Sequence, residues 1–246
     1  MSAALRAEWL KQVTTKTMLA LFGAMAGLVV LSVMLHGFGF STVQLAQRSN
    51  QLRVFVEAGE GLGAVFAGLI GAMSVTAEIR HGTIRPTLLA TPQRGRIIAA
   101  KAATSVLTGL AFGVVGTGLA AALGTAILSA RGVAIHLDGS AYALLLAGGA
   151  AAAALWAVIG VGLGAIVKNQ VTAVVVIFVW IEIIENLLVD GAPAISKYMP
   201  ATLGQAITGD RIGTIHTPAL GALLLTVYAV AAIAAGVVVT SRHDFA

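Results

Sequence analysis

The chain has 246 residues, of which 58% are hydrophobic and 10% charged, so it lacks the polar surface that a water-soluble globule of this size needs. Its net charge of +5 could point to nucleic acid, but the basic residues stand in short segments beside apolar runs, where membrane topology and anionic lipid explain them. We therefore expect no nucleic-acid partner. The absence of cysteine excludes disulfides, thiolate metal sites and thiol catalysis.

Six apolar runs are long enough to cross a bilayer, for which a helix needs about 20 residues. They predict an all-α, polytopic membrane protein with a single transmembrane domain over residues 1–246. The expected spans are 18–35, 59–77, 97–130, 140–167, 171–189 and 218–239. The third run is longer than one crossing requires, so its start is expected to project into the cytoplasm, with Lys101 snorkelling to the membrane surface.

The first 17 residues have an amphipathic pattern, in which Leu5, Trp9 and Val13 recur at four-residue spacing and charged residues such as Lys11 lie between them. This pattern predicts a helix in the membrane interface, with Trp9 at headgroup depth. The alternative, a charged tail that only orients the first span, stays open.

The stretch 78–96 is the longest basic interruption between two apolar runs. It carries four arginines and a single acid, Glu78, so the positive-inside rule places it in the cytoplasm. Gly82 and Thr83 are expected to end the preceding helix, and Pro86 suits the first turn of a new one. We predict a short helix over about 86–90, against which a soluble partner could push.

The distribution of charge predicts the topology of the whole chain. Ten of the fifteen basic residues fall in the segments assigned to the cytoplasm, and the five outside are matched by five acids. Both termini are therefore expected in the cytoplasm.

The fifth span ends in two carboxylates, Glu182 and Glu185, which are three residues apart and expected on one helical face. Charged groups at this depth are costly, so they could line a transport pathway or its external gate, and Asn186 extends the same face. The alternative is that both reach interfacial water. The following segment, 190–217, alternates apolar and helix-breaking residues and predicts an external re-entrant hairpin, in which Tyr198 and Pro200 are further candidates for the pathway or its gate.

The sequence contains no phosphate-binding loop, no metalloprotease or serine-hydrolase motif, and no histidines at metal-ligand spacing. We therefore expect no enzyme activity and no cofactor in this chain. If ATP is used, another chain must bind it.

The chain resembles the membrane subunits (permeases) of type-2 ATP-binding-cassette (ABC) transporters, in their small bacterial six-span form. The resemblance covers the charged start with Glu8 and Lys11 and the six spans, and its most specific part surrounds the first cytoplasmic loop. That part consists of Glu78, Gly82, Thr83, Arg85, Leu88, Pro92, Arg94 and Lys101.

The resemblance implies a coupling helix between the second and third spans, seated on a separate ATPase subunit that binds ATP and Mg. Glu78, Gly82, Thr83 and Arg85 would form the elbow into this helix, and Arg94 and Lys101 would anchor the third span. The contact with the ATPase would use Pro86, Thr87, Leu88, Leu89 and Thr91. It also implies a second permease copy, a bacterial cytoplasmic membrane, and a hairpin that caps the pathway.

Three functions are compatible with these features. The first is the permease half of an exporter for hydrophobic or amphipathic substrates. The second is a proton- or ion-coupled carrier or channel that uses Glu182 and Glu185. The third is a scaffold that recruits an enzyme to the membrane.

Overall fold

The structure is a computed structural model that describes residues 3–83, 94–209 and 217–242, and every regular element in these ranges is helical. The long helices are α2 (Lys16–Gly39), α5 (Leu62–Arg80), α7 (Arg94–Ala130), α8 (Gly139–Val167) and α13 (Pro218–Arg242). The short ones are α1 (Ala3–Thr14), α3 (Thr42–Leu45), α4 (Arg48–Phe55), α9 (Gln170–Val179), α10 (Glu185–Gly191), α11 (Pro193–Ser196) and α12 (Pro200–Ile207). Two π-helical turns, η1 (Val56–Gly61) and η2 (Trp180–Ile184), precede α5 and follow α9.

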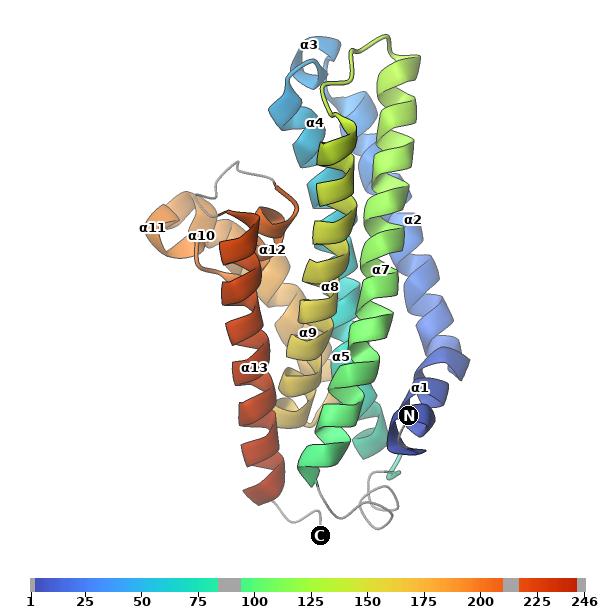
Figure 1. The fold of residues 1–246 in the computed structure, drawn as a ribbon, viewed down its shortest axis with the longest axis vertical. Coiled ribbons are helices and arrows are strands. Elements are labelled where there is room, and N and C mark those ends of the chain that lie inside the picture. Colours follow the sequence, from blue (N-terminus) through green and yellow to red (C-terminus); the bar gives the residue numbers. More distant parts are fainter. Residues whose placement is uncertain (1–2, 84–93, 210–216, 243–246) are drawn as a thin grey trace.

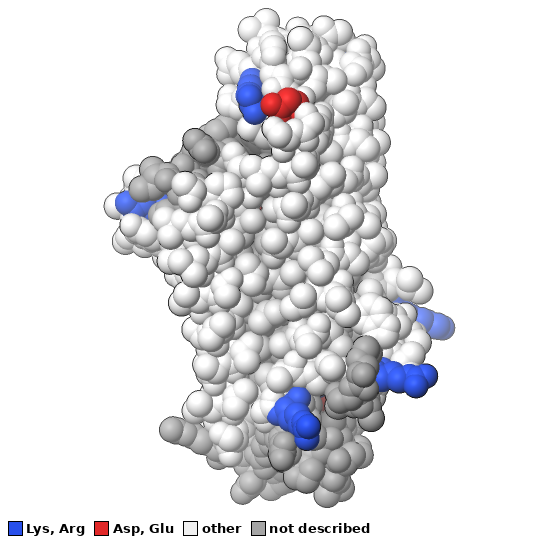
Figure 2. Space-filling view, viewed as in Figure 1, with Lys and Arg blue, Asp and Glu red and all other residues white. Residues whose placement is uncertain are grey.

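Within the described ranges, six helices are long and apolar enough to cross a membrane. They are Lys16–Gly39, Ala58–Arg80, Gly95–Ala130, Gly139–Val167, Gln170–Val189 and Pro218–Ser241. The all-helical class and the six long apolar helices predicted from the sequence are therefore confirmed. Figure 2 shows charged side chains near both ends of the molecule, on the side where α10–α12 lie and on the opposite flank of the lower half, with an uncharged band between the upper and the lower groups. Such a band suits the hydrocarbon core of a bilayer.

The centre of the bundle is formed by α5 and α8, with α7 packed against both (Figure 1). Of the apolar window in the span containing α5, 72% is buried inside the molecule, against 17% for the spans in α2 and α13. The outer helices therefore turn large apolar side chains such as Leu31 and Leu223 outward. In a membrane protein, such faces meet lipid.

Small residues let the central helices approach until their backbones touch. Gly160 of α8 lies against the backbone of Gly68 in α5, and Gly164 lies against Ala72 one turn further on. About three turns earlier along α8, Gly149 packs against Thr117 of α7. Association of helices in lipid depends on such close van der Waals contact, because no hydrophobic effect drives it.

The helix ends gather in two groups (Figure 1). The start of α1, the end of α5, the start of α7 and the end of α13 lie at one end of the bundle, whereas α3, α4 and the α7–α8 turn lie at the other. The short helices α10, α11 and α12 lie beside the half of α13 that is distant from α1. The predicted helix over 86–90 lies outside the described residues.

The close α5–α8 contact predicts different effects for the same substitution at two glycines. Gly160→Val would place its side chain in the backbone of Gly68, and we expect it to lower the free energy of unfolding by about 3 kcal/mol. Gly27→Val is the control, since a Cβ at Gly27 meets nothing within 4 Å. Unfolding in mild detergent measures the stability of both variants. Equal losses in the free energy of unfolding would contradict the close contact between α5 and α8.

Candidate functional site

A buried ammonium group joins three helices at the end of the bundle where α1 lies. Lys101 of α7 is 1% exposed, and its Nζ donates hydrogen bonds to Glu8 Oε2 at 2.7 Å and to the Ser74 carbonyl oxygen at 2.9 Å. The same Nζ lies 2.9 Å from Oε1 of Glu78. An ammonium removed from water requires such partners, because its desolvation costs several kcal/mol.

Lys11 completes the group as a second cation on α1. Its Nζ donates to Glu8 Oε1 at 2.8 Å and to Glu78 Oε1 at 2.7 Å, so each carboxylate contacts both lysines. We call Glu8, Lys11, Glu78 and Lys101 the charged cluster. Its two positive and two negative charges cancel, and it ties α1 to α5 and α7.

The partners shift the pKa values of the two α1 residues in opposite directions. Burial alone would raise the pKa of the Glu8 carboxyl, but the ammonium groups of Lys101 and Lys11 outweigh it and hold this pKa below 4.5. Burial would likewise lower the pKa of Lys11, but Glu78 and Glu8 raise it above 10.5. Both shifts favour the charged forms near neutral pH.

Gln12 attaches α1 to α7 one turn after Glu8. Its Nε2 donates to Ser105 Oγ at 3.1 Å and to Thr104 Oγ1 at 3.3 Å, while Thr108 Oγ1 donates to Gln12 Oε1 at 3.2 Å. This contact was not expected from the sequence. Two features of the sequence could have indicated it. The third apolar run contains three hydroxyl residues close together, and the first helix has two polar residues, Glu8 and Gln12, at i, i+4 spacing on one face.

The end of α5 has the hydrogen bonds of a Schellman motif. Gly82 has a φ of +68°, its N–H donates to the Ile79 carbonyl, and the Thr83 N–H donates to the Glu78 carbonyl at 2.9 Å. Glycine takes this left-handed conformation at little cost, which explains why the helix ends here. Arg80, two residues before Gly82, donates a hydrogen bond at 3.3 Å to Oε1 of Gln170, the first residue of α9.

The predicted coupling residues divide into two groups. Glu78, Gly82 and Thr83 form the end of α5 and contribute to the charged cluster and its turn, as described above. Arg94 begins α7, but its side chain is outside the described set. The remaining predicted contacts, Arg85, Pro86, Thr87, Leu88, Leu89 and Thr91, lie outside the described residues.

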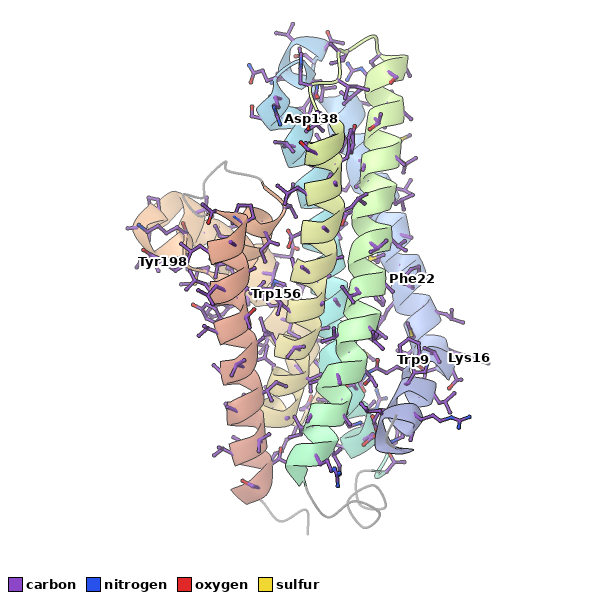
Figure 3. The ribbon with its side chains drawn as sticks, viewed as in Figure 1. Trp9, Lys16, Phe22, Asp138, Trp156 and Tyr198 are labelled. Atoms are coloured by element: carbon purple, nitrogen blue, oxygen red, sulfur yellow. The ribbon has the colours of Figure 1, made fainter. Side chains whose placement is uncertain are left out.

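One expectation about the charged cluster is wrong. Lys101 does not snorkel to the surface, because Glu8 and Glu78 provide partners for its charge inside the bundle. The first helix presents polar Glu8 and Gln12 to the bundle, while Trp9 is half-buried. Figure 3 shows Trp9 on α1 and Lys16 at the start of α2, both on the same side of the bundle.

At the other predicted site, the structure separates the two carboxylates of the fifth span. Glu185 is 3% exposed, and its Oε2 accepts the backbone N–H groups of Ala201 at 2.9 Å and Thr202 at 3.4 Å. Its Oε1 accepts from Trp180 Nε1 at 2.7 Å. Glu185 is thus an N-terminal cap for α12, where a negative charge is favourable.

Glu182 and Asn186 are exposed, and the Asn186 side chain donates to the Glu182 carbonyl at 2.9 Å. The π-helical turn η2 lies between α9 and Glu185, and a π turn holds more residues than an α turn. Residues three apart therefore no longer lie above one another. The shared helical face expected from the sequence is not present.

The remaining predicted residues of this site lie on or near α12. Pro200 is buried at the first turn of α12, and the carbonyl of exposed Tyr198 accepts from Tyr228 Oη at 3.2 Å. Glu60, at the start of the predicted span 59–77, was not among the expected site residues. Glu60 is 2% exposed in η1, and its carboxylate lies beside Gly204 of α12.

The described residues contain no group of three or more His, Asp or Glu side chains that could hold a metal ion. A helical bundle with six membrane-length helices and a charged cluster at one end defines a polytopic membrane protein. The chain belongs to the ABC-2 transporter family, since the family model described as "ABC-2 family transporter protein" matches residues 4–183. This range contains the whole charged cluster. A comparison with curated proteins gave no match.

Membership of this family makes the chain a membrane component of an ABC-2 type transporter. Such components are typically not catalytic and bind no cofactor, and the ATPase lies in a separate subunit. An ATPase partner is therefore implied.

The charged cluster predicts a large loss of stability when Lys101 is removed. Lys101→Met leaves Glu8 and Glu78 buried with Lys11 as their one remaining lysine, and we expect a loss of about 3–5 kcal/mol in the free energy of unfolding. Arg96→Met, on the exposed side of the same helix, is the control and should cost under about 0.5 kcal/mol. Equal effects in detergent unfolding would contradict the role of the cluster.

The pKa shifts predict how the attachment of α1 depends on pH. The pKa of Glu8 is depressed, so its contribution is present above pH 4.5 and is lost as the pH falls through the lower, folded value. The pKa of Lys11 is raised, so its contribution is present below pH 10.5 and is lost above that value. Hydrogen exchange of α1, corrected for the intrinsic effect of pH, should show protection between these limits.

The Glu8→Gln variant is the control for this measurement. It lacks the carboxyl that titrates, so the loss of α1 protection on acidification should be smaller than in the unmodified chain. If acidification removed the protection of α1 equally in Glu8→Gln and in the unmodified chain, the transition would belong to a group other than Glu8.

Proposed function

We propose that this chain is the permease half of an ATP-driven exporter, and that the end bearing the charged cluster faces the cytoplasm and the ATPase. The observation that carries the proposal is the ion pairing of Glu78 with Lys101, because these residues stand near the two ends of the segment that leaves α5 and returns as α7. The excess of basic residues in the segments assigned to this end supports the orientation.

The same pairing indicates how force would enter the bundle. The segment between Thr83 and Arg94, with its expected contacts at Arg85, Thr87 and Leu88, would rest on the ATPase. Because Lys101 contacts both Glu78 and Glu8, a displacement of this segment would move the ends of α5, α7 and α1 together. The transport cycle would then be a shift between two packings of the helices, driven by ATP and Mg bound in the partner.

The region around α12 would form the opposite, external end of the pathway. We assign α10, α11 and α12 to the expected re-entrant hairpin, which Glu185 supports by capping α12. A second permease copy would complete the pathway. The apolar interior suits a hydrophobic or amphipathic substrate.

The geometry favours this function over the proton- or ion-coupled carrier. That alternative needs Glu182 and Glu185 to act together, but Glu185 is buried as the cap of α12 and Glu182 is exposed. The scaffold alternative gives no role to a capped external helix.

The turn at Gly82 gives a matched pair of variants for testing the contact with the ATPase. Gly82 and Gly132 have φ values of +68° and +66°, end α5 and α7 with the same hydrogen bonds, and have open space where a Cβ would be. Valine at either position introduces strain of about 1–2 kcal/mol. Only Gly82→Val redirects the chain that leads to the proposed coupling helix.

We expect the unmodified chain and Gly132→Val to co-purify with the ATPase subunit of the transporter, and Gly82→Val to lose at least about tenfold of this binding, roughly 1.4 kcal/mol. ATP-dependent transport in proteoliposomes should fall in parallel. Binding that survives Gly82→Val, or transport by the chain without an ATPase, would refute the proposed function.

A further inference from the structure

A cavity of about 390 Å³ lies beside the charged cluster, between α1, the start of α2, α5 and α7. Ile70, Met73 and Ala77 of α5 provide an apolar wall, and the charged cluster lies at its polar end. Its volume falls within the range of small-molecule and lipid sites. The coupling role proposed above makes no use of this space.

One oxygen of the cluster has no hydrogen-bond partner in the part of the chain that the structure describes. Oε1 of Glu78 contacts both lysines, but Oε2 is buried and accepts no hydrogen bond from residues 3–83, 94–209 or 217–242. The Glu78 side chain is 10% exposed and lines the cavity. A buried carboxylate oxygen without a donor is costly. Because Oε2 is buried from the cavity as well as from solvent, a ligand with an N–H or O–H group would satisfy it once the Glu78 carboxylate turns toward the cavity.

The position of the cavity indicates where such a ligand comes from. Thr15 and Thr17 line it at the junction of α1 and α2, close in sequence to Trp9 and Lys16, which lie on this side of the molecule (Figure 3). Tryptophan and lysine are typical of the membrane–water interface. The cavity therefore lies at the depth of lipid headgroups, with its apolar wall in reach of acyl chains.

The charges of the cluster select among headgroups. The four side chains are neutral as a set, so a headgroup with one positive and one negative charge adds no net charge. The ammonium should face Glu78 Oε2, and the phosphate should face Lys11, whose side chain is 47% exposed. A quaternary ammonium has no N–H to donate, whereas a primary ammonium has three.

We propose that this cavity binds a phospholipid with a primary ammonium headgroup, such as phosphatidylethanolamine. The inference does not depend on the coupling role, because lipid binding needs no ATPase. It adds a ligand site at the junction of α1, α5 and α7.

Native mass spectrometry of the purified full chain tests the proposal, with dioleoyl phosphatidylethanolamine, phosphatidylcholine and phosphatidylglycerol as probes. We expect phosphatidylethanolamine to bind about tenfold more tightly than phosphatidylcholine, as one charge-assisted hydrogen bond allows. Equal binding of these two lipids, or a preference for phosphatidylglycerol, would overturn the proposal. Competition by free phosphoethanolamine at equal concentration would overturn the assignment to a lipid.

Two variants remove the site in different ways. Glu78→Gln replaces the accepting Oε2 by a donor, and Ala77→Leu fills the cavity without changing the charged cluster. Both should lose the preference for phosphatidylethanolamine, and a preference that survives Ala77→Leu would overturn the proposal even if Glu78→Gln does not fold. Asp138→Asn is the matched control, since it changes a carboxylate to an amide at the other end of the bundle and keeps the cap of α8.

Discussion

The buried ammonium of Lys101 is the constraint on which this end of the molecule depends. Its charge must be neutralised inside the bundle, and the two carboxylates that do so come from Glu8 on α1 and Glu78 on α5. The first helix must therefore lie on the bundle, and α5 must extend to Glu78 before it ends. The turn at Gly82 then releases the chain beside the cluster.

The opposite end uses a carboxylate in a related way. Glu185 satisfies two backbone N–H groups at the start of α12, which otherwise would have no helical partners. A π-helical turn precedes this residue, and another contains Glu60, whose carboxylate lies beside Gly204 of the same short helix. Irregular turns in the long helices thus direct two acidic side chains toward α12. Such turns often occur at functional sites.

The sequence predicted the features that depend on local pattern. Six apolar runs predict six long helices, because length and hydropathy suffice for this inference, and the glycine at position 82 predicts a helix end. The partners of Lys101 were not predictable, since they lie 93 and 23 positions away and meet it only in the folded bundle. The separation of Glu182 from Glu185 was missed because hydropathy gives no sign of a π turn.

The backbone contact between α5 and α8 has a consequence for how the bundle can change shape. Where Gly160 meets Gly68 there are no side chains that could rotate to absorb a relative displacement, so sliding one helix along the other would break the packing. This pair should behave as one stiff body, about 43 Å long if judged by the 29 residues of α8. Any relative movement of helices is then expected in the less buried outer helices α2 and α13, whose exposed apolar faces suit contact with lipid molecules that yield at little cost.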